Sequence, residues 1–320
     1  MSAVLDLFKP AAVAMLELGR VHSPDSCLVG LFALYLLFTS YSFIWSAICD
    51  NASKVDQIWS IVPFVYCWYT YYCWLESHSG QTHYRLLLIC TLTTVWGLRL
   101  SWNFWRKGGY GNLITHEEDY RWPILRKRIN SPTLFLLFNL TFIAAYQNFI
   151  LLLIALPAHH VMNGPAELNV WDIIVGFGFV AFFAMETIAD LQHWDFHERK
   201  YSVDTEVRKN HPDSDVRDGF YQHGLFQFCR HPNYFAEQSM WIMVYCFTLT
   251  RASSESLFSL DWGNNFVNPY FLGAFLLITL FQGSMAFSEE ITASKYPEYK
   301  RYQSTTSQCI PFFTAKEKSH

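Results

Sequence analysis

Residues 134–157 read LFLLFNLTFIAAYQNFILLLIALP, a stretch without a single Asp, Glu, Lys or Arg. At a rise of about 1.5 Å per residue, a helix of this length exceeds the roughly 30 Å hydrocarbon core of a bilayer. A segment inside the bilayer must satisfy its backbone hydrogen bonds internally. The stretch therefore predicts a transmembrane α-helix.

Similar apolar stretches, bounded by polar breaks, lie on both sides of this one. We expect helices at residues 28–48, 58–75, 84–105, 134–157, 170–191, 236–250 and 266–287. The composition agrees, with 52% hydrophobic, 16% charged and 18% aromatic residues. Trp and Tyr suit membrane interfaces. The fold class we predict is all-α and polytopic, with about seven transmembrane helices. They form one membrane domain, residues 28–313, between an N-terminal segment, 1–27, and a tail, 314–320.

The basic residues predict the orientation. Eighteen of the 23 Lys and Arg fall in the loops after the first, third and fifth expected helices or in the C-terminal region, and four fall on the other side. Cytosolic loops carry the excess of Lys and Arg, so we expect a luminal N-terminus and a cytosolic C-terminus. The sequence ends Lys316-Glu317-Lys318-Ser319-His320, which resembles a dilysine retrieval signal and predicts a multi-pass protein of the endoplasmic reticulum membrane.

Several classes of site are disfavoured. The net charge of −4 argues against nucleic-acid binding. The eight cysteines form no CxxC pair, so neither a disulfide framework nor a zinc site is indicated. His193 and His197 have the spacing of metal ligands on a helix, but no second such pair accompanies them, and no metal is expected. No obligate protein partner is indicated. Four cysteines lie in apolar runs and are interpreted as reduced packing residues: Cys67, Cys73, Cys90 and Cys246.

The stretch GLFQFCRHPNYFAE, residues 224–237, precedes the sixth expected helix. It places two cations, an amide, a phenol and a carboxylate at a membrane boundary. Ionisable groups are costly there, so such a concentration normally marks a functional site.

Other polar groups gather toward the same cytosolic edge. Glu186 and Asp190 are four residues apart and share one helix face. Facing inward, they can bind a ligand, or they can form a structural ion pair with Arg99 or Arg230. Arg99 can also extend its side chain to the headgroups. Asp56 begins the second expected helix, where it is either an interfacial cap or part of a site.

These local patterns resemble, in order along the chain, the steroid 5α-reductase C-terminal superfamily, and within it the DUF1295 branch. The resemblance covers about residues 30–313. It is carried by Asp56-Gln57-Ile58-Trp59-Ser60, Trp96-Gly97-Leu98-Arg99-Leu100, Glu118-Asp119-Tyr120-Arg121-Trp122, Glu186-Thr187-Ile188-Ala189-Asp190, Arg230-His231-Pro232-Asn233-Tyr234 and Glu289-Glu290.

The resemblance implies an NADPH-dependent membrane oxidoreductase that reduces a C=C bond in a lipid or steroid-like enone. The C-terminal half, about residues 170–313, would hold NADPH from the cytosolic side. The implied catalytic residues are Asp56, which lies near the position of the family's acid, and Tyr120. The implied cofactor-binding residues are Glu186, Asp190, Arg230, His231, Asn233, Tyr234, Glu237 and Glu289.

Two alternatives stay open. Arg230-His231-Pro232, followed by an aromatic and an acidic residue, also resembles the isoprenylcysteine and phospholipid methyltransferases. Those membrane enzymes use S-adenosylmethionine. The second alternative is a lipid-binding or scaffold protein without catalytic activity.

Overall fold

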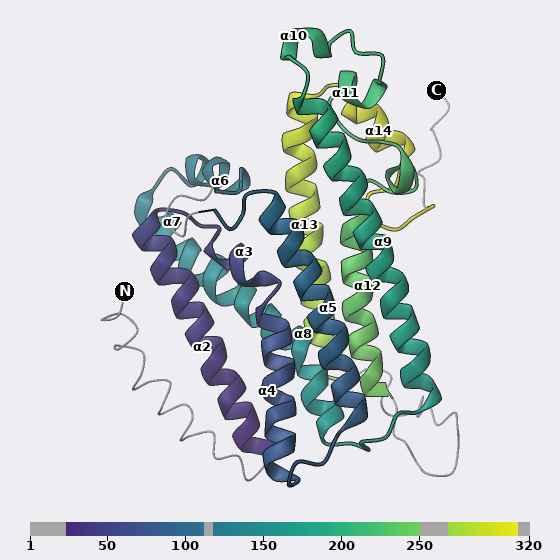
Figure 1. Ribbon diagram of the computed structural model, residues 1–320. Coiled ribbons are helices and arrows are strands. Elements are labelled where there is room, and N and C mark those ends of the chain that lie inside the picture. Colours follow the sequence, from purple (N-terminus) through teal and green to yellow (C-terminus); the bar gives the residue numbers. More distant parts are fainter. Residues whose placement is uncertain (1–23, 112–117, 250–267, 313–320) are drawn as a thin grey trace. The chain divides into compact units, whose positions relative to one another are not determined.

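The computed structural model describes residues 24–111, 118–249 and 268–312, and these residues contain helices and no strand. All seven expected helices are present (Figure 1). The retrieval motif at Lys316 and Lys318 and most of the N-terminal segment lie outside the described residues. The prediction of an all-α membrane protein is confirmed, since four helices are long and apolar enough to cross a bilayer: Ser26–Cys49, Pro132–Met162, Val170–Tyr201 and Phe271–Lys295.

The Cα positions divide the chain into two compact units. Unit 1 comprises residues 1–176 and 244–274, and unit 2 comprises residues 177–243 and 275–320. The three boundaries fall inside helices α9 (Val170–Tyr201), α12 (Pro232–Cys246) and α13 (Phe271–Lys295).

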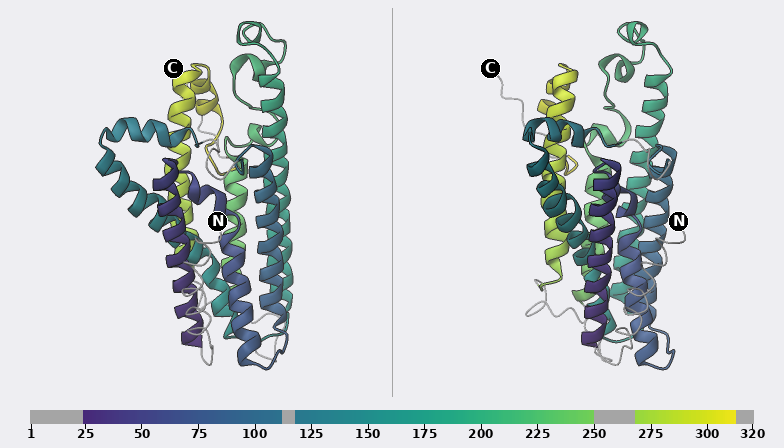
Figure 2. Two further views of the ribbon diagram at one scale, coloured as in Figure 1. Left: turned by 60° about the vertical axis from the view of Figure 1, so that its left-hand side comes forward. Right: turned by 90° about the vertical axis from the view of Figure 1, so that its left-hand side faces the viewer.

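Unit 1 contains most of the helices of the N-terminal half. They are α2 (Pro24–Cys49), α3 (Lys54–Trp59), α4 (Val62–Ser77), α5 (Tyr84–Arg106), α6 (Arg121–Ile129), α7 (Pro132–Phe138), η1 (Asn139–Tyr146), α8 (Gln147–Met162) and η3 (Phe247–Leu249). Helix α4 packs against α2, α5 and α8 (Figures 1 and 2). The residues of α8 that face this packing are buried, among them Ile150, Leu151 and Ile154.

Helix α7 continues through η1 into α8, and η1 is a π-helix. Polar side chains join this long helix to α2. Asn139 donates its side-chain amide to Ser46 Oγ at 2.7 Å, and Asn148 donates to Ser42 Oγ at 3.1 Å. Both asparagines are buried. Hydrogen bonds of this kind hold transmembrane helices together where no hydrophobic effect separates helix from lipid.

The second expected helix is divided in two. Residues 54–59 form α3, and α4 begins only at Val62. Pro63 has no N–H to donate to the carbonyl four residues earlier, at Trp59, so a continuous helix is interrupted here, and the proline stands in the first turn of α4, where no N–H is needed. The break separates Asp56 from the longer helix and leaves it on a short turn of its own.

Unit 2 contains most of α9 and α13 together with α10 (Thr205–Arg208), α11 (Ser214–Asp218), η2 (Gly224–Gln227), α12 (Pro232–Cys246) and α14 (Tyr299–Thr305). Ring contacts join its three long helices. Phe182 of α9 meets Phe235 of α12 at 5.9 Å between centroids, and Tyr234 of α12 meets Phe281 of α13 at 4.8 Å. Phe220, Tyr299 and Tyr302 form a small buried cluster that anchors α14.

Candidate functional site

The sequence-predicted site residues fall into two groups. Asp56 and Tyr120 belong to unit 1, whereas the eight residues expected to bind the cofactor belong to unit 2.

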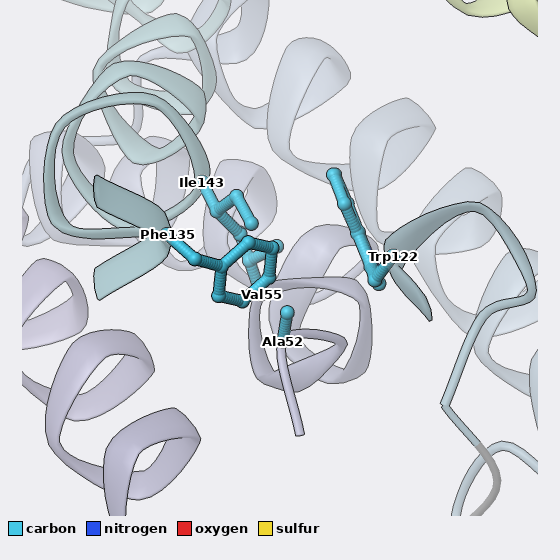
Figure 3. Close-up of a cluster of buried hydrophobic side chains, with 5 residues drawn as sticks. All are labelled: Ala52, Val55, Trp122, Phe135 and Ile143. Carbon is cyan, nitrogen blue, oxygen red and sulfur yellow. The ribbon is translucent and has the colours of Figure 1, made fainter. Parts of the chain in front are cut away.

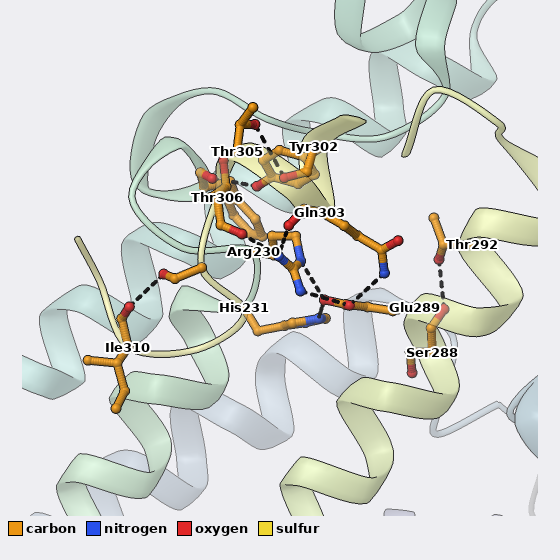
Figure 4. Close-up of polar contacts among 12 residues, drawn as sticks. Arg230, His231, Ser288, Glu289, Thr292, Tyr302, Gln303, Thr305, Thr306 and Ile310 are labelled. Atoms are coloured by element: carbon orange, nitrogen blue, oxygen red, sulfur yellow. Dashed lines mark hydrogen bonds and ion pairs between the residues drawn. The ribbon is translucent and has the colours of Figure 1, made fainter. Parts of the chain in front are cut away.

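Glu289 is the centre of the polar network in unit 2 (Figure 4). Its side chain is 5% exposed and accepts two hydrogen bonds from Arg230, Nε at 2.7 Å and Nη2 at 2.9 Å. His231 Nε2 lies 3.0 Å from Oε1 of the same carboxylate, and Gln303 donates to Oε2 at 2.8 Å. Paired, parallel bonds between a guanidinium and a carboxylate are among the strongest hydrogen bonds in proteins. The sequence prediction named Arg230, His231 and Glu289 separately, and the structure brings them together.

The C-terminal part of unit 2 supplies the remaining hydrogen-bond acceptors of the Arg230 side chain. The third nitrogen, Nη1, donates to the carbonyl of Gln303 at 3.1 Å and also to the carbonyl of Thr306. The backbone N–H groups of Arg230 and His231 donate to the carbonyls of Ser307 and Gln308. Each nitrogen of the Arg230 side chain thus has a protein acceptor. Arg230 in this arrangement holds the loop before α12 against the segment after α14.

A second group of acids lies where α9 and α12 pack together. The contact between Phe182 and Phe235 and the stacking of His193 on Phe226 at 5.8 Å bracket one face of α9. Glu186 and Asp190 lie on that face between the two contacts, because residues three to four apart share a helix face. Both carboxylates are buried, at 2% and 6% exposure. This stretch of α9 faces the loop that leads into α12 and the first turns of α12.

The first turns of α12 carry the remaining predicted residues of unit 2. Pro232 is the first residue of the helix, and Asn233 and Tyr234 follow it half-buried. Glu237 is 7% exposed. Ring packing between Tyr234 and Phe281 sets the direction of the phenol. The structure therefore gathers carboxylates, an amide and a phenol from α9, α12 and α13 in one unit.

Asp56 in unit 1 has a different environment. Its Oδ2 atom is buried and accepts no hydrogen bond from any residue that the structure describes. Burial, reinforced by the negative charge of Asp119, raises the pKa of Asp56 to about 6, although Arg121 and the side chains of Ser53 and Trp122 act in the opposite direction. A carboxyl group in such surroundings is poised to carry a proton near neutral pH.

The Asp56 turn is held by the segment that contains Asp119. Glu118 accepts a hydrogen bond from the Ala52 N–H at 2.8 Å, and the Asp119 N–H donates to Ser53 Oγ at 2.9 Å. Arg121 donates to both oxygens of Asp119, at 2.8 and 3.0 Å. Two motifs that are far apart in the sequence thus meet in space.

Apolar packing fixes the same contact from the other side. Ala52, Val55, Trp122, Phe135 and Ile143 form a buried cluster, and Trp122 lies over the α3 turn in Figure 3. Tyr120, in contrast, is 49% exposed at the start of α6. Asp119, Arg121 and Trp122 shape the surroundings of Asp56, a role that their motif alone did not predict.

His193 and His197 lie with their Nε2 atoms 3.2 Å apart. Within residues 24–111, 118–249 and 268–312, no three His, Cys, Asp or Glu side chains come together as metal ligands would. His193 instead stacks on Phe226, so the pair belongs to the packing of α9 on η2.

Comparisons of the sequence with known proteins identify the family of the chain. Residues 42–306 match DUF1295, described as a protein family of unknown function. The chain belongs to the DUF1295 family. It is also 33% identical over 320 residues to an uncharacterized protein of Schizosaccharomyces pombe, with 95% of this chain and 87% of the yeast protein covered. No solved structure matches the chain.

Proposed function

We propose that this DUF1295 protein is an NADPH-dependent membrane oxidoreductase that reduces the C=C bond of a lipid or steroid-like enone. The proposal extends the resemblance to the steroid 5α-reductase superfamily. The observation that carries it is the group of buried carboxylates on α9 and α12, Glu186, Asp190 and Glu237, beside Asn233 and Tyr234. Buried acids in membrane helices are costly and are kept mainly where they bind a ligand or move a proton.

The donor and acceptor set of unit 2 fits a dinucleotide. Carboxylates accept hydrogen bonds from ribose hydroxyls, and an asparagine side chain can both donate to and accept from a carboxamide. Glu186, Asp190, Glu237 and Asn233 would hold the nucleotide in this way. When bound, NADPH would supply a hydride for the β-carbon of the conjugated carbonyl. The proposed role of Arg230 is positioning, since Glu289 and backbone carbonyls already engage its guanidinium.

The proposed proton donor is Asp56, at its Oδ2 atom. With a pKa of about 6 the acid is partly protonated near neutral pH, and its proton can neutralise the oxyanion that develops on the substrate carbonyl. The proposed role of Tyr120, which is exposed, is contact with the substrate.

A second candidate rests on one specific contact. The Arg230-His231-Pro232 motif, shared with S-adenosylmethionine-dependent membrane methyltransferases, is joined directly to Glu289 through both Arg230 and His231. A carboxylate held by the motif could bind the amino group of S-adenosylmethionine. Lipid binding without catalysis is the third candidate.

Cofactor titration separates these candidates. Detergent-purified protein should gain about 2.7 kcal/mol of unfolding free energy with NADPH at one hundred times its dissociation constant, because the ligand binds only the folded state. Asn233→Ala and Glu237→Gln should abolish this gain. Ser239→Ala is the matched control, because its hydroxyl bonds to the Phe235 carbonyl within α12. Stabilisation by S-adenosylmethionine without stabilisation by NADPH would reverse the assignment, and stabilisation by neither would favour lipid binding alone.

We further propose that about seven helices span the membrane of the endoplasmic reticulum, with the N-terminus luminal and the C-terminus cytosolic. Helices α4 and α12 have 16 and 15 residues, so each spans about 24 Å or less and would need a locally thinned bilayer. After selective permeabilisation of the plasma membrane, a tag at His320 should react with antibody and a tag at Met1 should not. Equal accessibility of the two tags would refute an odd number of spans.

A further inference from the structure

Two cysteines of unit 1 face one another at one end of the packed pair α2 and α4. Cys27 is three residues after the start of α2, and Cys73 is four residues before the end of α4. Their exposures are 0% and 1%, and their thiols lie within interaction range of each other. The structure holds both as free thiols. The sequence analysis interpreted Cys73 as a packing residue, because no spacing rule connects it with Cys27.

The packing of the two helices explains why the thiols meet. A Cβ atom added to Gly30 of α2 would come within 1.8 Å of the Tyr69 hydroxyl of α4, so the Tyr69 ring packs directly on the backbone of Gly30 and sets the register of the two helices. Cys27 lies one turn before Gly30, and Cys73 lies one turn after Tyr69. The helices run in opposite directions there, since Gly30 lies in the first third of α2 and Tyr69 lies in the second half of α4. One turn further along, the same faces present Cys27 to Cys73.

This end of the helices is the luminal end in the predicted orientation. The thiols lie about 6 Å or less from the helix ends, close to the aqueous boundary. A second pair of neighbouring thiols, Cys67 of α4 and Cys90 of α5, is also fully buried, but Cys67 lies about 15 Å from the end of α4. Disulfides form and persist in oxidising compartments such as the lumen of the endoplasmic reticulum.

We propose that Cys27 and Cys73 form a disulfide bond that fastens α2 to α4 at the luminal side of the membrane, whereas Cys67 and Cys90 stay reduced. The two thiols lose two protons and two electrons as the S–S bond forms. A protein disulfide of the luminal thiol-oxidation system accepts the electrons and is reduced to two thiols. A disulfide requires a Cα separation of about 5.5–6 Å. The side-by-side packing of α2 and α4 places the two buried thiols opposite each other, where such a bond can form. The inference rests on the orientation and is independent of the reductase activity.

Differential alkylation tests the bond on the full-length protein. Microsomes are lysed in denaturant with N-ethylmaleimide, and the protein is mapped by mass spectrometry before and after reduction. Chymotrypsin separates Cys27 from Cys49 and Cys67 from Cys73, because aromatic residues lie between the members of each pair. The expected result is a Cys27–Cys73 linked peptide that disappears on reduction, with Cys67 and Cys90 alkylated from the start.

A substitution sharpens the test. In Cys73→Ser, Cys27 should become reactive toward N-ethylmaleimide without reduction, and the Cys67→Ser control should leave the Cys27–Cys73 peptide in place. Alkylation of Cys27 and Cys73 in unreduced wild-type protein to the same extent as Cys67 and Cys90 would overturn the proposal. So would a disulfide from either cysteine to another partner. The wild-type map needs no variant, so a folding defect in Cys73→Ser would not obscure the result.

Discussion

Glu289 in unit 2 and Asp56 in unit 1 are both acids with a carboxyl oxygen withdrawn from water, but their hydrogen bonding differs. Glu289 accepts hydrogen bonds from Arg230 and Gln303 and contacts His231. Asp56 Oδ2 has no donor among the described residues and lies near a second acid, Asp119. A carboxylate whose oxygens all accept hydrogen bonds holds the elements around it together. A buried carboxyl oxygen without a donor lowers stability and favours the protonated form, which is a common condition of functional acids.

The largest effect is expected for Glu289→Ala. The substitution leaves the guanidinium of Arg230, whose side chain is 8% exposed, without its counter-charge. Removing one partner of a buried ion pair costs about 3–5 kcal/mol. Thermal unfolding in detergent should show this loss, and Glu290→Ala, at the exposed neighbouring position, should change stability far less. Equal effects of the two substitutions would mean that the Glu289 network does not hold unit 2 together.

Asp56→Asn should increase the free energy of unfolding, whereas Glu289→Ala decreases it. Native Asp56 keeps its proton up to a pKa of about 6, whereas the unfolded chain releases it near 3.8, so wild-type stability falls as pH rises between these values. The difference corresponds to at most about 3 kcal/mol. Asp56→Asn removes this dependence, and its advantage should grow from pH 4 to about pH 6 and stay constant above. Chemical denaturation across this pH range measures the difference.

The same variant tests the proposed role of Asp56. If Asp56 donates the proton, Asp56→Asn should bind NADPH normally and lose turnover, and wild-type turnover should decline as pH rises above about 6. A variant that is neither more stable at neutral pH nor slower in turnover would remove the contrast between the two acids.

These contrasts show how far the sequence could predict the molecule. Each of the seven long apolar helices was predicted, because apolar periodicity and length determine them locally. Their ends were less accurate: α12 begins at Pro232, four residues before the expected start, and α8 continues through Pro157 to Met162. The short helices α3 and α6 depend on a proline break and on packing over Trp122, which no local pattern specifies.

The candidate site was predicted as a collection of residues and not as an arrangement. Arg230 and Glu289 are separated by 59 residues, and their pairing depends on how α13 packs in unit 2. The approach of Asp119 to Asp56 likewise follows from hydrogen bonds of Ala52 and Ser53 with residues 66 positions away. Charge patterns predict that such groups need partners, and tertiary structure decides which partners they have.

A smaller effect is expected for Asn148→Leu, which removes the hydrogen bond from α8 to Ser42 in α2. Such interhelical bonds contribute about 0.6 kcal/mol on average and up to about 1.7 kcal/mol. A double-mutant cycle with Ser42→Ala isolates the pair. A coupling energy near zero would show that α2 and α8 are held by apolar packing alone.

The smallest effect is expected for Asp50→Asn, which breaks the ion pair with Arg126 near the Asp56 turn. The Asp50 side chain is 88% exposed, and exposed ion pairs contribute about 0–1 kcal/mol. The change in unfolding free energy should stay within about 0.5 kcal/mol and show none of the pH dependence of Asp56→Asn. A large effect at Asp50 would mean that the charges of this loop act together and that the stability effect of Asp56→Asn is not specific to Asp56.

The pairing of Arg230 with the end of unit 2 also has a consequence for biosynthesis. The carbonyl of Thr306, one of the acceptors of the guanidinium, lies 76 residues later in the chain. At translation rates of about 5–20 residues per second, Arg230 leaves the ribosome roughly 4–15 seconds before that acceptor exists. During this interval the nascent loop before α12 carries a charged side chain without its native partners at the membrane. The loop before α12 can therefore complete its native hydrogen bonds only after α14 and the residue that follows it have been synthesised.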